Sequence, residues 1–155
     1  MTERKPVNVL FLCTGNSARS ILGEAVLQRL GDAEVQAFSA GSHPTGRVNP
    51  YTIELLNELG YATDALQSKS WDEFSEADSP TMDYVITVCS NAAGEVCPVW
   101  PGHPMKDHWD ISDPAAVEGT REEKLRAFLA AYRDIEQRVG ALLENIHENR
   151  PGAVT

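Results

Sequence analysis

The sequence has few of the features of a secreted or membrane-bound protein. Its 155 residues include three cysteines, an odd number that suits reactive thiols in a reducing compartment better than a disulfide framework. No segment approaches the roughly 18 consecutive apolar residues of a membrane helix. The charged start, Met1–Pro6, lacks the apolar core of a secretory signal. We therefore expect a cytoplasmic protein that does not bind membranes.

Positive charge is also scarce. Thirteen Lys and Arg residues stand against 23 Asp and Glu residues, which gives a net charge of −10. A field of this sign repels nucleic acid, so a nucleic-acid partner is excluded, and any site for an anion must be a local positive exception. The length and the 42% hydrophobic content favour a single domain over 1–155, with a core over about 7–148.

Apolar runs alternate with helical patterns along the chain. We expect strands at 7–12, 35–39 and 84–88, a short strand near Trp109, and helices at 20–30, 50–59 and 120–146. The alternation predicts an α/β fold, a doubly wound four-stranded parallel sheet with helices on both faces. Ligands of such sheets bind beyond the carboxyl ends of the strands, where Cys13 and Cys89 both lie.

The loop that follows the first strand has the composition of an oxyanion site. Cys13 and Arg19 are separated by five residues, among them Gly15 and Ser17, and a helix begins directly afterwards. Small residues let backbone amides turn inward beside a helix N-terminus, which attracts a tetrahedral oxyanion. Arg19 can grip two oxygens of that anion, and the same field favours the thiolate of Cys13. Ser20 is placed to donate a hydrogen bond to that sulfur, and Asn16 to hold the loop shape.

The segment Val9–Ser20 closely resembles the active-site stretch of arsenate reductases built on the low-molecular-weight protein tyrosine phosphatase fold. The likeness continues at Ser39-Ala40-Gly41, Asn49-Pro50, Thr87-Val88-Cys89, His108-Trp109 and Asp113-Pro114. It implies reduction of arsenate, with phosphate or sulfate as mimics. The implied substrate-binding residues are Thr14, Gly15, Asn16, Ser17, Ala18, Arg19 and Ser20.

By this resemblance Cys13 attacks arsenate, Cys89 attacks Cys13, and Cys97 then carries the disulfide outward. A helix between Cys89 and Cys97 would hold their Cα atoms about 12 Å apart, whereas a disulfide tolerates no more than about 7 Å. We therefore expect 90–96 to loop out when that bond forms. An external thiol reductant, thioredoxin or glutathione with glutaredoxin, would reset the enzyme. No tightly bound cofactor is expected, and we expect a monomer.

Two further residues acquire roles from the resemblance. Asp113 matches the general acid that protonates a departing oxygen, although Asp-Pro is also common as a turn or helix cap. Some members bind potassium through four side chains, three of which correspond to Asn16, Glu24 and Ser39. The fourth position falls near Lys69, whose ammonium would replace the cation. We therefore predict no metal and no potassium requirement.

Two alternative functions are open at this point. The first is a tyrosine phosphatase that uses the same loop, although Ala18 replaces a second loop cysteine and Ala115-Ala116 replaces aromatic residues after Asp-Pro. The second is a non-enzymatic metal-binding protein that uses Cys89, Cys97, His103 and His108. The spacing of these four residues does not match that of structural zinc sites.

Overall fold

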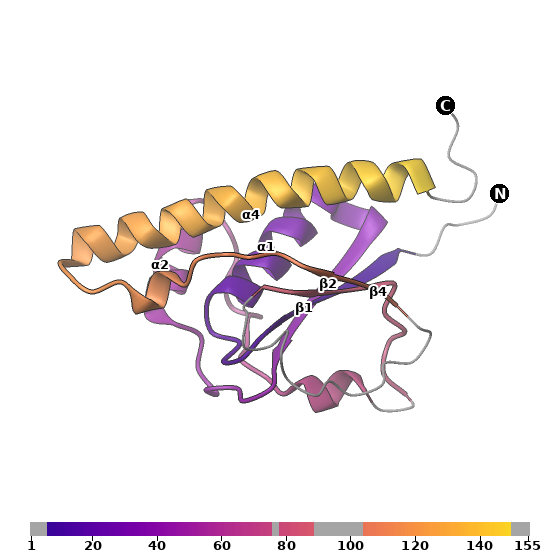
Figure 1. Ribbon diagram of the computed structural model, residues 1–155, viewed down its shortest axis with the longest axis horizontal. Helices are drawn as coiled ribbons and strands as arrows, with labels where there is room; N and C mark the ends of the chain where they lie inside the picture. Colours follow the sequence, from indigo (N-terminus) through magenta and orange to yellow (C-terminus); the bar gives the residue numbers. More distant parts are fainter. Residues whose placement is uncertain (1–5, 76–77, 89–103, 150–155) are drawn as a thin grey trace.

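A four-stranded parallel sheet forms the centre of the protein. The computed structural model describes residues 6–75, 78–88 and 104–149. The strands are β1 (Val7–Cys13), β2 (Val35–Gly41), β3 (Tyr84–Thr87) and β4 (Met105–His108). Their order in the sheet is β2-β1-β3-β4, so β1 and β3 are central. The predicted α/β class and parallel sheet are confirmed (Figure 1).

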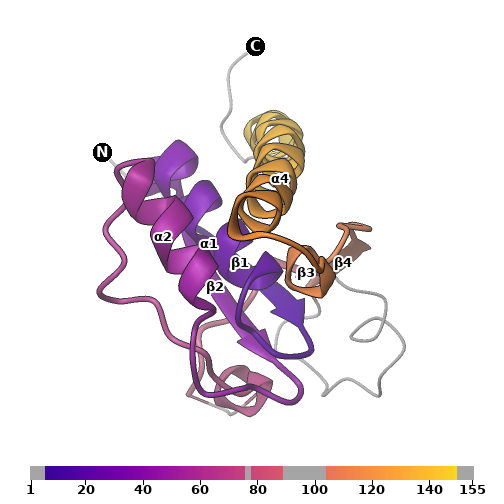
Figure 2. The ribbon, with the colours of Figure 1, turned by 90° about the vertical axis from the view of Figure 1, so that its left-hand side faces the viewer.

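Helices cover the sheet unequally. α1 (Arg19–Gly31), α2 (Pro50–Glu58) and α4 (Arg121–Asn149) lie on the same side of the sheet, as Figure 2 shows. Their apolar side chains share one core with Val9, Phe11 and Ile86 of the sheet. The opposite face packs against the short 3-10 helix η2 (Trp71–Phe74), which contributes Phe74 to a second, smaller core. None of the helices described is long and apolar enough to span a membrane.

The strand register places the ends of β1 and its neighbours together. Cys13 is paired with Gly41 at the carboxyl end of β2, and Leu12 is paired with Thr87 at the end of β3. β2 lies beside one edge of β1 and β3 beside the other, so the strand order reverses at β1, which is where sheets of this type bind ligands. The register therefore places Cys13 at the expected location for a site.

The predicted helix starts are present. Asn49 accepts a hydrogen bond from the N–H of Tyr51 with Pro50 at the first helical position. Thr120 and Glu123 form the predicted capping box at the start of α4, with Glu123 N–H donating to Thr120 Oγ1 over 3.1 Å. Here the capping residues determine where each helix begins.

One predicted helix face is wrong. Apolar spacing predicts that α2 packs through Ile53, Leu56 and Leu59. The helix instead buries Thr52, Leu55 and Leu56, while Leu59 is 36% exposed just beyond its end. The inward side of α2 is thus shifted by about one residue relative to the prediction, and it carries Thr52, whose hydroxyl bonds to the loop after β1.

Candidate active site

The loop between β1 and α1 is held from outside through its carbonyl oxygens. The oxygen of Thr14 accepts from the N–H of His43 over 2.9 Å, and that of Gly15 accepts from the N–H of Thr45 over 3.0 Å. Ser68 Oγ also donates to Gly15 O over 3.1 Å. The oxygen of Ser17 has two donors, Asn49 N–H at 2.9 Å and Thr52 Oγ1 at 3.1 Å. Three carbonyls of the loop are thus turned toward the protein around it.

The directions of the loop N–H groups follow from the directions of these carbonyls. Across a trans peptide the carbonyl of one residue and the N–H of the next point in opposite directions, and the described residues contain no cis peptide. The N–H groups of Gly15, Asn16 and Ala18 therefore point away from the donors that hold Thr14, Gly15 and Ser17. Successive backbone N–H groups that are turned away from the surrounding protein can form a concavity for an anion.

Asn16 controls the loop conformation. It has a φ of 48°, in the left-handed region that Asn tolerates better than most residues, and it is fully buried. Its Oδ1 accepts from the N–H of Lys69 over 2.8 Å, and its Nδ2 donates to Ser20 Oγ over 2.8 Å. These two bonds tie the loop to the segment at Lys69 and to the first turn of α1.

Cys13 is buried, with 6% of its surface exposed, directly before this loop. Gly41, its partner in β2, lies too close to the loop to carry a side chain. A Cβ atom there would lie 2.5 Å from the oxygen of Thr14 and 3.0 Å from the nitrogen of Asn16. Since real Cβ atoms essentially never approach backbone so closely, the glycine permits the loop to lie against β2.

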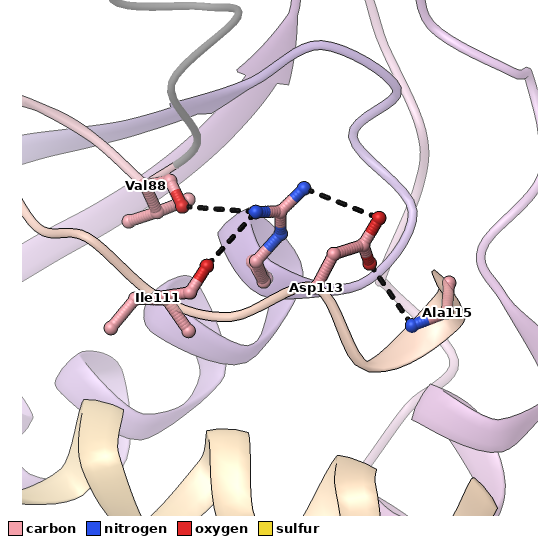
Figure 3. Close-up of polar contacts among 5 residues, drawn as sticks. Val88, Ile111, Asp113 and Ala115 are labelled. Carbon is pink, nitrogen blue, oxygen red and sulfur yellow. Dashed lines mark hydrogen bonds and ion pairs between the residues drawn. The ribbon is translucent and has the colours of Figure 1, made fainter. Parts of the chain in front are cut away.

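Arg19 joins three segments that are distant in the sequence. Its Nη1 donates to the oxygen of Ile111 over 3.0 Å and to that of Val88 over 3.5 Å. Its Nη2 lies 3.5 Å from Oδ2 of Asp113, and the Arg19 side chain is 14% exposed (Figure 3). The loop end of α1 is therefore tied to the segments after β3 and β4.

Asp113 caps a 3-10 helix with one carboxylate oxygen and faces the loop arginine with the other. Its Oδ1 accepts from the N–H of Ala115 over 3.0 Å, which caps the 3-10 helix η3 (Pro114–Ala116). Its Oδ2 faces Arg19, and the side chain is 41% exposed. A carboxyl that is fixed beside the loop arginine and accessible to solvent can exchange a proton with a bound group.

Glu24, Ser39 and Lys69 lie together behind the loop. Ser39 Oγ donates to Glu24 Oε1 over 2.5 Å, and Lys69 Nζ donates to the oxygens of Gln67 at 3.1 Å and Ser39 at 3.4 Å. Burial raises the pKa of the Glu24 carboxyl, against the opposing effects of the Ser39 hydrogen bond and the Lys69 charge. Because a lysine ammonium takes these carbonyl oxygens, the group does not fit a bound potassium ion.

A family model, described as low molecular weight phosphotyrosine protein phosphatase, matches residues 8–151. The chain belongs to this family. An arsenate reductase of Shouchella clausii is 33% identical over 136 residues, which cover 88% of this chain and 94% of that protein.

Two solved structures with a similar fold are described as arsenate reductases. The thioredoxin-dependent arsenate reductase Cg_ArsC1' of Corynebacterium glutamicum is 26% identical with a TM-score of 0.70, and the match covers 96% of this chain and 66% of that chain. A structure described as an arsenate reductase in the phosphate binding state is 25% identical with a TM-score of 0.70, covering 90% of this chain and 98% of that chain. Members of the phosphatase fold thus include proteins named for arsenate reduction.

Several predicted residues lie outside the described part of this phosphatase-family chain. They are Cys89, Cys97 and His103, together with the segment 90–96. His108 is exposed on β4, with its Nδ1 2.7 Å from Thr87 Oγ1. Within 6–75, 78–88 and 104–149, no three His, Cys, Asp or Glu side chains are grouped so as to hold a metal ion.

Thr52 and Ser68, which were not predicted as site residues, both donate hydroxyl hydrogen bonds to loop carbonyls. Ser68 lies in an irregular segment and gave no pattern. Thr52 left one signal: it is a polar residue on the side of a short helix that also carries Leu55 and Leu56. A polar side chain on an apolar face indicates a specific hydrogen bond there.

Proposed function

We propose that this protein is an arsenate reductase that uses Cys13 as its nucleophile. The observation that carries the proposal is the loop after Cys13, in which the carbonyls of Thr14, Gly15 and Ser17 are all held outward. The opposed amides and Arg19 supply positive charge in a protein with a net charge of −10. Relatives named as arsenate reductases support arsenate as the anion.

In the first step the Cys13 thiolate attacks arsenic. A sulfur–arsenic bond forms and one arsenic–oxygen bond breaks, and the oxygen leaves as water with one proton from Asp113 and another from solvent. Backbone amides of the loop stabilise the charge on the remaining oxygens. The residues of this loop are Thr14, Gly15, Asn16, Ser17 and Ala18. Ser20 Oγ accepts from Asn16, which leaves its own proton available for the Cys13 sulfur, and such a bond would favour the thiolate.

In the second step arsenic is reduced. The Cys89 thiolate attacks the sulfur of Cys13, a disulfide forms, and the sulfur–arsenic bond breaks with its electron pair passing to arsenic. Arsenite leaves, and the two electrons have come from the two thiolates. Cys97 then attacks Cys89, which releases Cys13 as a thiolate and moves the disulfide to Cys89 and Cys97.

An external dithiol reductant completes the cycle by reducing the Cys89–Cys97 disulfide. The two donor systems to compare are thioredoxin and glutathione with glutaredoxin. The solved relative from Corynebacterium glutamicum is named as thioredoxin-dependent, which makes thioredoxin the first donor to test. Arsenate-dependent NADPH oxidation, coupled in turn to each system, identifies the donor.

A phosphatase reaction is the second candidate, because the family description names phosphotyrosine protein phosphatases. Phosphate and arsenate have the same shape and charge, so a loop that binds one binds the other. Ester hydrolysis requires Cys13, Arg19 and Asp113 but neither Cys89 nor Cys97. We expect hydrolysis of phosphate monoesters as a slow side reaction.

Cysteine variants separate these functions. Cys13→Ser abolishes both arsenate reduction and ester hydrolysis, since both begin at this sulfur. Cys89→Ser and Cys97→Ser lose catalytic turnover of arsenate while keeping the hydrolysis rate of the wild-type protein. Normal arsenate reduction by Cys89→Ser would exclude the disulfide relay, and normal reduction by Cys13→Ser would exclude the proposed nucleophile.

A further inference from the structure

Four polar side chains are fully buried among the residues that the structure describes: Asn16, Ser20, Ser39 and Thr52. Asn16 and Ser20 bond to each other within the loop, and Ser39 bonds to Glu24 behind it. Thr52 is the one member of this set that comes from α2. Burying a hydroxyl without a hydrogen bond costs free energy, so the Thr52 side chain needs a polar partner in the interior.

Thr52 reaches the loop through a single hydrogen bond. Its Oγ1 donates to the oxygen of Ser17 over 3.1 Å, beside the N–H of Asn49 at 2.9 Å. These two donors use both lone pairs of the Ser17 carbonyl. The first turn of α2 is therefore attached to one peptide of the loop, the peptide that joins Ser17 to Ala18.

This peptide leads into Ala18, the N-cap residue directly before α1 begins at Arg19. Its carbonyl is held toward α2, so its N–H, which belongs to Ala18, is held in the opposite direction. Two donors on one acceptor restrict rotation of the peptide more than the Asn49 N–H alone would. A rotation here would remove one amide from the anion site and would move the adjacent Arg19.

We propose that Thr52 is a positioning residue that keeps the Ala18 N–H turned toward the bound oxyanion. The role depends on the proposed use of the loop as an anion site. Thr52 acts through Ser17, because its hydroxyl donates to the Ser17 carbonyl on the side of the loop that faces α2. The chemical class of ligand that it affects is any tetrahedral oxyanion, with inorganic phosphate as the probe.

Thr52→Val tests the role with little change in volume. Ser17 O keeps the Asn49 donor in this variant, so folding is expected to persist, and Thr52→Ala provides a second variant without the hydroxyl. Thr52→Ser restores the donor. Thr63→Val is the matched control, because the Thr63 hydroxyl donates over 3.0 Å to Asn57 Oδ1 near the other end of α2.

The measurements are the pH midpoint of iodoacetamide alkylation at Cys13, followed by mass spectrometry, and protection of Cys13 by inorganic phosphate. Loss of one well-aligned hydrogen bond weakens phosphate protection about fivefold in Thr52→Val, and the alkylation midpoint moves to higher pH. Thr52→Ser restores both values, and Thr63→Val equals wild type. Thermal unfolding of all variants is measured beside these values.

The results distinguish this role from the proposed function. If wild type shows no protection by phosphate, the anion site itself is refuted, and the role of Thr52 with it. If wild type is protected and Thr52→Val and Thr52→Ala match it in both measurements, the positioning role is refuted while the anion site stands. Failure of Thr52→Ser to restore the wild-type values also overturns the role, since the hydroxyl would then not be what matters.

Discussion

The Nη2 atom of Arg19 lies 3.5 Å from Oδ2 of Asp113, although the two residues are 94 positions apart in the sequence. Nη1 of the same guanidinium donates to carbonyl oxygens of Ile111 and Val88. The carboxyl is thereby fixed beside the anion loop before any substrate arrives. A general acid that is already positioned needs little reorganisation when the reaction occurs.

Asp113→Asn tests this carboxyl as the acid. The variant keeps an oxygen that can accept from Ala115 N–H and cap η3, but it has no proton to donate at the departing oxygen. We expect kcat to fall about 100-fold, which is the low end of the contribution of a general acid. Phosphate binding should change little. Steady-state arsenate reduction, followed as release of arsenite, checks this.

Asp110→Asn provides the matched control, because Asp110 is an exposed carboxylate in the same segment. It should keep the wild-type rate. A wild-type rate in Asp113→Asn would exclude Asp113 as the acid and leave it the capping role alone.

Potassium should not activate the enzyme. Lys69 Nζ donates to the oxygens of Ser39 and Gln67 and faces the Glu24 carboxyl, so a fixed positive charge is already present behind the loop. We expect equal rates of arsenate reduction in potassium chloride and in sodium chloride at matched ionic strength. Clear activation by potassium over sodium in the wild-type protein would contradict this expectation.

Local sequence patterns predicted most of the framework around this site. The apolar run at Val7–Leu12 predicted β1, and the pairs Asn49-Pro50 and Thr120 with Glu123 predicted the starts of α2 and α4. These features depend on neighbours within a few residues along the chain. The composition of the loop after Cys13 also predicted an anion site. In the structure three carbonyls of this loop point toward the surrounding protein, which leaves the N–H groups that follow them turned the other way.

Contacts between distant segments could not be predicted in the same way. The partners of Arg19 at Val88 and Ile111 are backbone oxygens. Since every residue type has a backbone carbonyl, the sequence does not indicate which one accepts the bond. The buried side of α2 is a similar case. Apolar periodicity favoured Ile53, whereas the buried side carries Thr52, whose hydroxyl bonds to Ser17 in a distant segment.

Glu24 should make the protein more stable as the pH falls toward mildly acidic values. Burial raises its pKa in the folded state above the ordinary value of 4.5, so the folded protein binds a proton more readily than the unfolded chain. Between 4.5 and the raised pKa the free energy of unfolding therefore decreases as pH rises. Glu24→Gln cannot titrate, and we expect this part of the pH dependence to disappear in the variant.

Urea unfolding of wild type and Glu24→Gln at a series of pH values from 4.5 to 8 measures the difference. Glu58→Gln serves as control, since Glu58 is an exposed carboxylate at the end of α2. Its profile should parallel that of wild type. Parallel profiles for wild type and Glu24→Gln would show that the folded state does not raise the affinity of Glu24 for its proton.

A methyl group at Gly41 should displace the anion loop, whereas the same change at Gly140 should not. In Gly41→Ala the Cβ would lie 2.5 Å from Thr14 O and 3.0 Å from Asn16 N, and both neighbours are backbone atoms that can yield only if the loop moves. A displacement of about 1 Å at a catalytic group can cost on the order of 100-fold in rate. We expect a loss of arsenate reduction and of phosphate protection at Cys13.

Gly140 lies inside α4, and a Cβ built there meets nothing within 4 Å. Gly140→Ala should therefore keep the wild-type activity and raise the free energy of unfolding by up to about 1 kcal/mol, because alanine favours a helix interior more than glycine does. The comparison separates displacement of the loop from the general effect of adding a methyl group. If Gly41→Ala binds phosphate as tightly as Gly140→Ala, the close contact of β2 with the loop does not maintain the anion site.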